Sequence, residues 1–156
     1  MLKLDIPGFK KLEIEHLVLD LNGTTACDGM VSEEIKDKIN QVSDFLKVHV
    51  LTADTFGTAS KELEGLNCEL VILDETDQAE QKAQFLEELN PLRTIAVGNG
   101  RNDVRMLNFA AIGISVMNPE GTSVHALTNS DIVCRNFPEV MELLENPRRL
   151  KATLRT

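Results

Sequence analysis

The sequence predicts an α/β domain with a mostly parallel sheet that helices cover on both faces. Apolar runs of strand length alternate along the chain with segments whose apolar residues recur every three or four positions, which is typical of repeated βαβ units. The 156 residues, 42% of them hydrophobic and 26% charged, are enough for one domain with a real core. In such sheets ligands bind at the carboxyl ends of the strands, so the chemistry is expected in the residues that directly follow each apolar run.

The first half of the chain opens with a strand. Leu12 to Leu21 begins with alternation and ends in a continuous apolar stretch, as a central strand does. Ser32 can cap a helix that runs to about Lys47. The elements predicted next are a strand at Val48 to Leu51, a helix capped by Asp54 and ended by Gly65, a strand at Leu70 to Leu73, and a helix that begins with a capping box of Asp77 and Glu80 and ends before Pro91.

The second half repeats this alternation. Its predicted elements are a strand at Thr94 to Val97, a helix through Met106 and Leu107, strands at Ile112 to Val116 and Ile132 to Cys134, a helix opened by Pro138, and a short basic helix from Arg148 to Arg155. No internal repeat or linker divides the sequence, so residues 1–156 are predicted to form a single domain.

Composition excludes several classes of function. The net charge is −9 and there is no Trp or Tyr, which argues against nucleic-acid binding by a basic face or by base stacking. No apolar stretch approaches the length of a membrane span, and the first residues lack the apolar core of a signal peptide. Cys27, Cys68 and Cys134 form no CxxC pair, which favours reduced thiols in a cytoplasmic protein.

The first predicted strand ends in Asp20, followed by Leu21-Asn22-Gly23-Thr24. A carboxylate at a strand end can act as a nucleophile beside the free backbone N–H groups of a Gly-Thr turn, which suit the oxygens of a phosphate. Asp, Asn and Gly are also common where a strand simply enters a turn. This motif alone leaves both interpretations open.

Two further polar positions follow the next strands. Thr52 ends the second strand and could donate to a phosphate oxygen, although Thr52 and Asp54 are also ordinary capping residues. Lys82 lies one turn into the helix after the third strand, where its charge could neutralise a phosphate or could merely be solvated.

The fourth strand ends in Gly98-Asn99-Gly100-Arg101-Asn102-Asp103. The glycines permit a tight turn, and the Asn and Asp side chains offer the oxygen ligands that Mg²⁺ prefers. A dinucleotide-binding fingerprint is the rival interpretation, but it needs a third glycine where Asp103 stands and normally follows the first strand of its unit.

Together these four features resemble, in order and context, the motifs of the haloacid dehalogenase-like phosphotransferase superfamily, which are Asp-x-Asp-Gly-Thr, a Thr or Ser after a strand, a Lys, and Gly-Asp-Gly-x-x-Asp. The segment GNGRNDVRML is most similar to the fourth motif of P-type ATPases, and the chain resembles the small soluble P-type ATPase-like phosphatases. The resemblance extends over about residues 12 to 145 and implies a three-layer α/β/α sandwich with a Rossmann-like sheet.

The resemblance also implies an Mg²⁺-dependent phosphatase or phosphotransferase in which Asp20 forms an aspartyl-phosphate, and it implies three overlapping sets of site residues. The catalytic set is Asp20, Asn22, Thr52 and Lys82. The phosphate-binding set is Gly23, Thr24, Thr52, Ala53, Lys82 and Asn102. The metal-binding set is Asp20, Asn22 through its main-chain carbonyl, Asn99 and Asp103.

Two positions depart from the family pattern. Asn22 stands where most phosphatases of the family have the Asp that protonates the leaving oxygen, and an amide cannot do this. Asn99 replaces the acidic residue that ligates Mg²⁺ in P-type ATPases and offers only an uncharged carbonyl oxygen. We therefore expect slow turnover, and the alternative is a phosphate-binding or regulatory protein that keeps the fold without useful catalysis.

The intervals between the motifs are short. Neither the stretch from Asp20 to Thr52, with a turn-rich flap at Thr25 to Val31, nor the stretch from Thr52 to Lys82 can hold an inserted cap domain. Capless relatives often close the site by oligomerising or act on large substrates. The partners expected from the resemblance are a small phosphorylated substrate and a second copy of the chain. The composition predicts neither a nucleic-acid partner nor a membrane.

The remaining candidates favour ordinary structural roles. His16, His49 and His125 lack the spacing of metal ligands and are predicted to be packed or surface residues. Arg101 and Arg105 flank the fourth motif, where they could touch substrate or lie on an exposed helix face. Near the C-terminus, basic residues are expected to oppose the dipole of a helix rather than to bind an anion.

Overall fold

A computed structural model describes all 156 residues and contains a six-stranded parallel sheet. Its strand order is β5-β4-β3-β6-β7-β8, so the first strand of the sheet in sequence lies near the centre. The strands are β3 (His16–Asp20), β4 (Lys47–Thr52), β5 (Glu69–Ile72), β6 (Thr94–Gly98), β7 (Ile112–Val116) and β8 (Ile132–Cys134). All residues of β3, β6 and β7 are buried, as expected of strands that helices cover on both faces.

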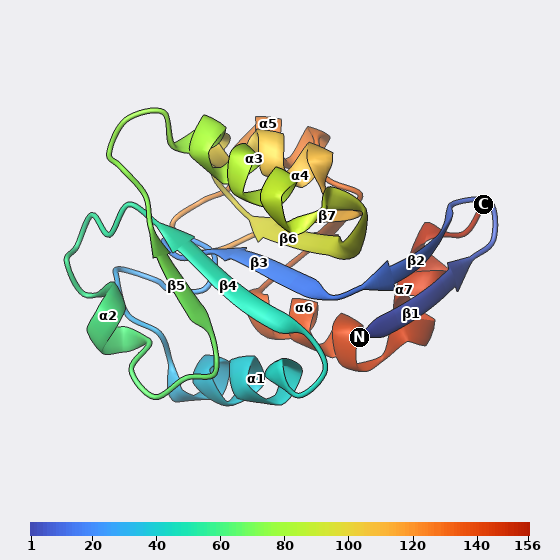
Figure 1. Ribbon diagram of the computed structural model, residues 1–156, viewed down its shortest axis with the longest axis horizontal. Helices are drawn as coiled ribbons and strands as arrows, with labels where there is room; N and C mark the ends of the chain where they lie inside the picture. Colours follow the sequence, from blue (N-terminus) through green and yellow to red (C-terminus); the bar gives the residue numbers. More distant parts are fainter.

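Helices cover the two faces of the sheet (Figure 1). They are α1 (Glu33–Ser43), α2 (Ala59–Glu62), α3 (Gln78–Leu89), α4 (Val104–Phe109), α5 (Val124–Thr128), α6 (Phe137–Glu145) and α7 (Pro147–Leu154), with single 3₁₀ turns at η1 (Pro91–Arg93) and η2 (Arg101–Asp103). One core cluster joins the sheet to α3, α4 and α5 through Leu86, Met106 and Ala126, and a larger one joins it to α1 and α6 through Ile39 and Val140. The predicted three-layer sandwich is confirmed.

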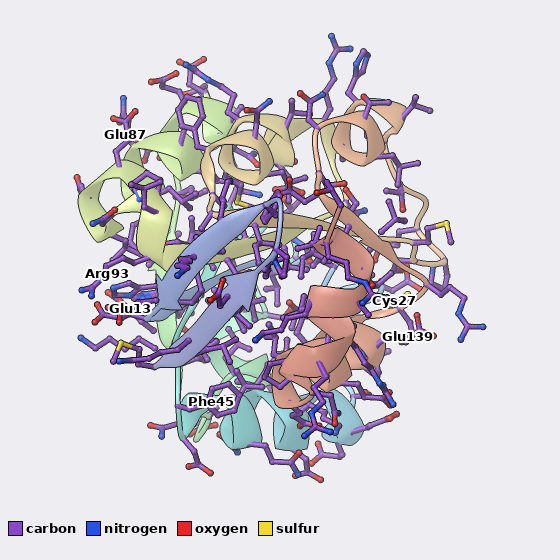
Figure 2. The ribbon with its side chains drawn as sticks, turned by 90° about the vertical axis from the view of Figure 1, so that its right-hand side faces the viewer. Glu13, Cys27, Phe45, Glu87, Arg93 and Glu139 are labelled. Atoms are coloured by element: carbon purple, nitrogen blue, oxygen red, sulfur yellow. The ribbon has the colours of Figure 1, made fainter.

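An antiparallel hairpin of β1 (Leu2–Ile6) and β2 (Lys10–Ile14) precedes the sheet and was not predicted. The stretch expected as one strand from Leu12 to Leu21 divides at Glu15, because its alternating half has one face in solvent whereas its continuous half is fully buried. The hairpin extends beyond the sheet and packs on α7 (Figure 1). Figure 2 shows the hairpin with Glu13 beside Arg93, which forms an ion pair with it.

Several helix boundaries differ from the predicted ones. The helix expected to run from Asp54 to Gly65 is only the four-residue α2, because the chain first makes a turn in which Gly57 has a φ of +65°. Asp54 still caps it, since its Oδ1 accepts from the N–H groups of Thr58 and Ala59. The capping box at Asp77 is wrong, because Asp77 has a φ of +53° and its side chain makes no cap hydrogen bond. Helix α1 ends at Ser43 rather than near Lys47, and α5 was not predicted.

None of the helices is long and apolar enough to cross a membrane. The three cysteines are free thiols, of which Cys134 is buried. Burial raises the pKa of the Cys134 thiol to about 11. It is therefore a protonated packing group at neutral pH.

Two buried histidines and an exposed glutamate form a row across β3, β4 and β5. His16 Nδ1 and His49 Nε2 are 3.0 Å apart, and His49 Nδ1 is 2.7 Å from Glu69 Oε2. One ring nitrogen of the His16–His49 contact must donate and the other accept, so both rings cannot be protonated while the contact persists. Burial lowers the pKa of His16, and His49 acts in the same direction. Lys47 and Arg93 also lower this pKa, whereas Glu15 raises it.

We expect acid to destabilise the protein through His16. Its folded-state pKa lies below the value of 6.5 for an unfolded chain, so its contribution to the free energy of unfolding is present above about pH 6.5 and is lost as the pH falls. His16→Gln should flatten the slope of unfolding free energy against pH between 7 and 5 by up to about 1.4 kcal/mol per pH unit. Chemical denaturation at several pH values measures it. The exposed His125→Gln is the control and should keep the wild-type slope; an unchanged slope in His16→Gln would contradict the prediction.

Candidate active site

The polar motifs meet at the carboxyl edge of the sheet, around a buried lysine. Lys82 Nζ donates to Asp20 Oδ1 at 2.5 Å and to Asp103 Oδ1 at 2.6 Å. Asp20 is the last residue of β3, Asp103 ends η2 after the neighbouring β6, and α3 carries Lys82. Lys82 and Asp103 are 0% exposed and Asp20 is 7% exposed. Three motifs far apart in the sequence thus form one ionic cluster.

The charges of this cluster depend on one another. Burial and the charge of Asp103 raise the pKa of Asp20 to about 7, against the opposing effects of Lys82 and Thr24. Burial lowers the pKa of Lys82, but the charges and hydrogen bonds of the two carboxylates outweigh it, so this pKa is raised overall. Lys82 stays protonated and favours the ionised form of Asp20, which is almost completely buried.

The turn after β6 is held by Asp103. Its Oδ2 accepts from the backbone N–H groups of Asn99 at 2.9 Å and Gly100 at 2.8 Å. A Cβ on Gly98 would lie 2.5 Å from Cγ of Asp103, so only glycine fits at the end of this strand. Both carboxylate oxygens of Asp103 are therefore already bonded, one to Lys82 and one to the turn. The structure places Asp103 as the group that orients this turn.

Three side-chain oxygens come together here, one of them from Asp20 itself. Thr24 Oγ1 is 3.1 Å from Asp20 Oδ2 and 3.1 Å from Asn99 Oδ1. The hydroxyl has one proton to share between them, so one acceptor keeps a lone pair without a donor. Asn99 Nδ2 donates to the carbonyl of Gly121 at 2.9 Å, which turns Asn99 Oδ1 toward this cluster. A group of uncharged oxygens with one carboxylate fits a hard divalent cation such as Mg²⁺.

A glycine makes this approach of the two loops possible. Gly23 has a φ of +78°, and a Cβ there would lie 2.4 Å from Nδ2 of Asn99. The first and fourth motifs are thus in direct contact. Asn22, just before this glycine, is half-buried, and its backbone bridges to Ala26.

Thr52 ends β4, the strand beside β3, and is 2% exposed. Its Oγ1 accepts from the N–H of Asp54 at 2.9 Å, so its own hydroxyl proton remains free to donate. Ala53 follows it and is half-buried. Both residues lie at the same edge of the sheet as Asp20.

Hydrogen bonds join the flap from Thr25 to Val31 to the start and end of α2 and to the loop that contains Glu120. Thr58 Oγ1 donates to the carbonyl of Gly29 at 3.1 Å, and the N–H of Val31 donates to Glu62 Oε2 at 2.9 Å. On the other side the N–H of Asp28 donates to Glu120 Oε1 at 2.6 Å. The sequence predicts the flap but gives no signal for these three ties.

The structure separates the two arginines that flank the fourth motif from the ionic cluster. Arg105 pairs with Glu80 on α3, and Arg101 is exposed. Sequence reasoning missed Gln78, whose Oε1 accepts from Asn102 Nδ2 at 2.8 Å. The available signal was its position four residues before Lys82, on the same face of a helix. A cavity of about 680 Å³ lies away from the cluster, where β4 and β5 begin, and has His49 and Glu69 in its lining.

The chain resembles known phosphatases in sequence, although no model of a known protein family matches it. A soluble P-type ATPase-like phosphatase of Methanocaldococcus jannaschii is 29% identical over 137 residues, which is 85% of this chain and 50% of that protein. A phosphoserine phosphatase of Lactococcus lactis is 29% identical over 119 residues, 75% of this chain and 54% of that protein. The chain thus spans about half the length of these two phosphatases. An uncharacterised protein of M. jannaschii is 44% identical over 78 residues, 47% of this chain and 84% of that protein.

Solved structures share the whole fold. A cobalt-bound deoxy-D-mannose-octulosonate 8-phosphate phosphatase of Haemophilus influenzae superposes with a TM-score of 0.72 at 12% identity, over 92% of this chain and 94% of that one. A 3-deoxy-D-manno-octulosonate 8-phosphate phosphatase of Moraxella catarrhalis, in complex with magnesium and phosphate, gives 0.66 at 17% identity, over 91% and 94%. The chain therefore shares the fold of the haloacid dehalogenase-like hydrolases. In sequence it is similar to a soluble P-type ATPase-like phosphatase.

Proposed function

We propose that this protein is an Mg²⁺-dependent phosphatase that works through an aspartyl-phosphate on Asp20. The observation that carries the proposal is the buried contact of Asp20 with Lys82, beside the oxygens of Thr24 and Asn99. It provides a carboxylate nucleophile, a fixed cation for the transferring phosphoryl group, and oxygens suited to a divalent metal. The named relatives that are phosphatases support the same class of reaction.

The reaction proceeds in two displacements at phosphorus. A carboxylate oxygen of Asp20 forms a bond to phosphorus while the ester P–O bond breaks, and the electron pair leaves with the ester oxygen. Lys82 and the hydroxyl of Thr52 stabilise the phosphoryl oxygens. Water then attacks phosphorus, the bond to Asp20 breaks, and orthophosphate leaves. A bound Mg²⁺, held by Asp20, Asn99 and the main-chain carbonyl of Asn22, would offset the repulsion between the carboxylate and the phosphate dianion.

Asn22 determines which substrates react well. The ester oxygen takes its proton from solvent, because the amide of Asn22 has no acidic proton to give. Leaving groups that are stable as anions therefore react fastest. The same amide cannot deprotonate the water of the second step, so the aspartyl-phosphate is long-lived.

We propose a small phosphorylated substrate and action in the cytoplasm. The relatives with named substrates act on phosphoserine and on an eight-carbon sugar phosphate. With a net charge of −9, the surface does not suit a nucleic acid or an anionic membrane. A homo-oligomer, which would cover an open site, stays a prediction of the family resemblance.

The covalent intermediate gives the direct test. Wild-type protein incubated with Mg²⁺ and acetyl phosphate or an aryl phosphate, then quenched in acid, should gain the mass of one phosphoryl group on the peptide that contains Asp20. Asp20→Asn should gain none, and Asp28→Asn in the exposed flap should be labelled like wild type. Labelling that persists in Asp20→Asn would refute the nucleophile.

A second candidate function is favoured by the two amides, Asn22 and Asn99, in an otherwise intact site. Here the protein binds phosphate or phosphorylates Asp20 as a regulatory event without useful turnover. Steady release of orthophosphate that depends on Mg²⁺ and is lost in Asp20→Asn excludes this alternative.

A further inference from the structure

Two side chains of α3, one helical turn apart, reach the same turn of the fourth motif. Lys82 Nζ bonds Asp103 Oδ1 at 2.6 Å, and Gln78 Oε1 accepts from Asn102 Nδ2 at 2.8 Å. The first pair is fully buried, whereas Gln78 and Asn102 are half-buried. The second pair lies one helical turn nearer the start of α3 than the first and is partly open to solvent.

Gln78 and Asn102 also line an open cavity of about 490 Å³. Its other lining residues are Glu75, Asp77, Ala79 and Arg101. The cavity lies between the loop that enters α3 and the turn of the fourth motif. It opens beside the side chains of Gln78 and Asn102.

The side chain of Gln78 is itself fixed. Its Nε2 donates to the carbonyl of Glu75 at 3.3 Å. The same loop is held by Gln81, whose Nε2 donates to the carbonyl of Thr76 at 2.6 Å and whose Oε1 accepts from the N–H of Asp74 at 3.0 Å. Gln78 therefore presents its Oε1 to Asn102 in one orientation.

This acceptor decides which end of the Asn102 amide faces the site. One N–H of Asn102 is bonded to Gln78, and the second N–H of the same group remains free to donate to an anion. Without the acceptor, the amide can rotate by half a turn and present its carbonyl oxygen, which repels a phosphate oxygen. The orientation of Asn102 thus depends on a residue that does not itself touch the phosphoryl group.

We propose that Gln78 is a positioning residue that holds Asn102 as a hydrogen-bond donor to the phosphate of the substrate. The proposal rests on the proposed phosphatase function and adds a specific determinant of substrate affinity to it. An interaction made equally with bound substrate and with the transition state changes KM and leaves kcat unchanged.

The test is a double-mutant cycle with Gln78→Met and Asn102→Ala, assayed with an aryl phosphate and by orthophosphate binding in the presence of Mg²⁺. We expect Gln78→Met to raise KM and the Kd of orthophosphate by roughly 5- to 10-fold, with kcat within about twofold of wild type. In the Asn102→Ala background the same substitution should have no further effect. Gln84→Met is the matched control, because Gln84 is exposed on the same helix and bonds only Glu80.

Each outcome separates the proposals. An unchanged KM in Gln78→Met, or an equal rise of KM in the presence and absence of Asn102, would overturn the positioning role while leaving the phosphatase intact. A Gln78→Met variant that loses thermal stability but keeps KM and the Kd of orthophosphate would also overturn the positioning role. Wild-type protein that neither hydrolyses the ester nor binds orthophosphate would overturn the proposed function and this inference with it.

Discussion

Replacing Lys82 by methionine is expected to lower the free energy of unfolding by about 3–5 kcal/mol and to abolish hydrolysis. Methionine is similar in length, so the packing volume at this 0% exposed position changes little. The charge is lost, however, and Asp20 and Asp103 are left as two carboxylates at a nearly dry position without their shared cation. Removing one partner of a buried ionic group is costly because the remaining charges cannot regain their hydration.

The loss of unfolding free energy in Lys82→Met should depend on pH. The folded-state pKa of Asp20 is already raised to about 7, and removal of Lys82 raises it further. A carboxyl group whose folded-state pKa is raised contributes stability at low pH and loses it as the pH rises through that value. Lys82→Met should therefore be closer to wild type at pH 5 than at pH 8, as measured by chemical denaturation. Added Mg²⁺ should stabilise the variant more than it stabilises wild type.

The exposed ion pair of Lys11 with Asp5 provides the control. Its side chains are 84% and 64% exposed, so Lys11→Met should change stability by no more than about 0.5 kcal/mol. If Lys82→Met cost as little as this control, the ionic cluster would not be a structural unit, and its role as the site would lose its main physical support.

The sheet could be predicted from the sequence because each of its strands is a local pattern. The runs at Ile112 to Val116 and Ile132 to Cys134 coincide with β7 and β8, and burial on both faces makes such runs continuously apolar. The hairpin could not be separated from β3 so easily, because only Glu15 interrupts two segments that both read as strand. The length of helix α2 was overestimated for a related reason. Phe56, Ala59 and Leu63 have helical spacing, but Phe56 lies exposed in the turn before the helix.

Prediction of the site from the sequence was limited in a different way. Motif order placed Asp20, Thr52 and Lys82 after successive strands, and parallel topology alone brings such residues to one edge. What the sequence could not show is which side chains are already bonded. Asp103 stays a predicted metal ligand, but the sequence did not indicate that one of its oxygens bonds Lys82 and the other the N–H groups of the turn. Nor did it indicate that the partner of Asn102 is Gln78, 24 positions away. Pairings of this kind depend on the relative placement of a helix and a turn, which no local pattern encodes.

Asn22→Asp is expected to increase turnover, by an amount that depends on the leaving group. General acid–base catalysis by a well-placed carboxyl group is worth about 10²–10⁴-fold, and an alkyl phosphate should approach this range because its alkoxide cannot leave without a proton. An aryl phosphate gains less in the first step, since its phenolate leaves unprotonated. Steady-state assays of both esters measure the difference, and Asn108→Asp, exposed on α4, is the control.

The second displacement provides a further test of Asn22→Asp. A carboxylate at position 22 would also deprotonate the attacking water, so the phosphorylated form of the variant should decay faster after the substrate is removed. The backbone here is held by the bridge to Ala26, and Gly23 keeps the following turn in place, so the new carboxyl group should occupy the position of the amide. A variant that is no faster with either ester would show that the missing acid does not limit this protein. The slow step would then lie with the metal-binding oxygens around Asn99, and Asn99→Asp would be the substitution that raises turnover.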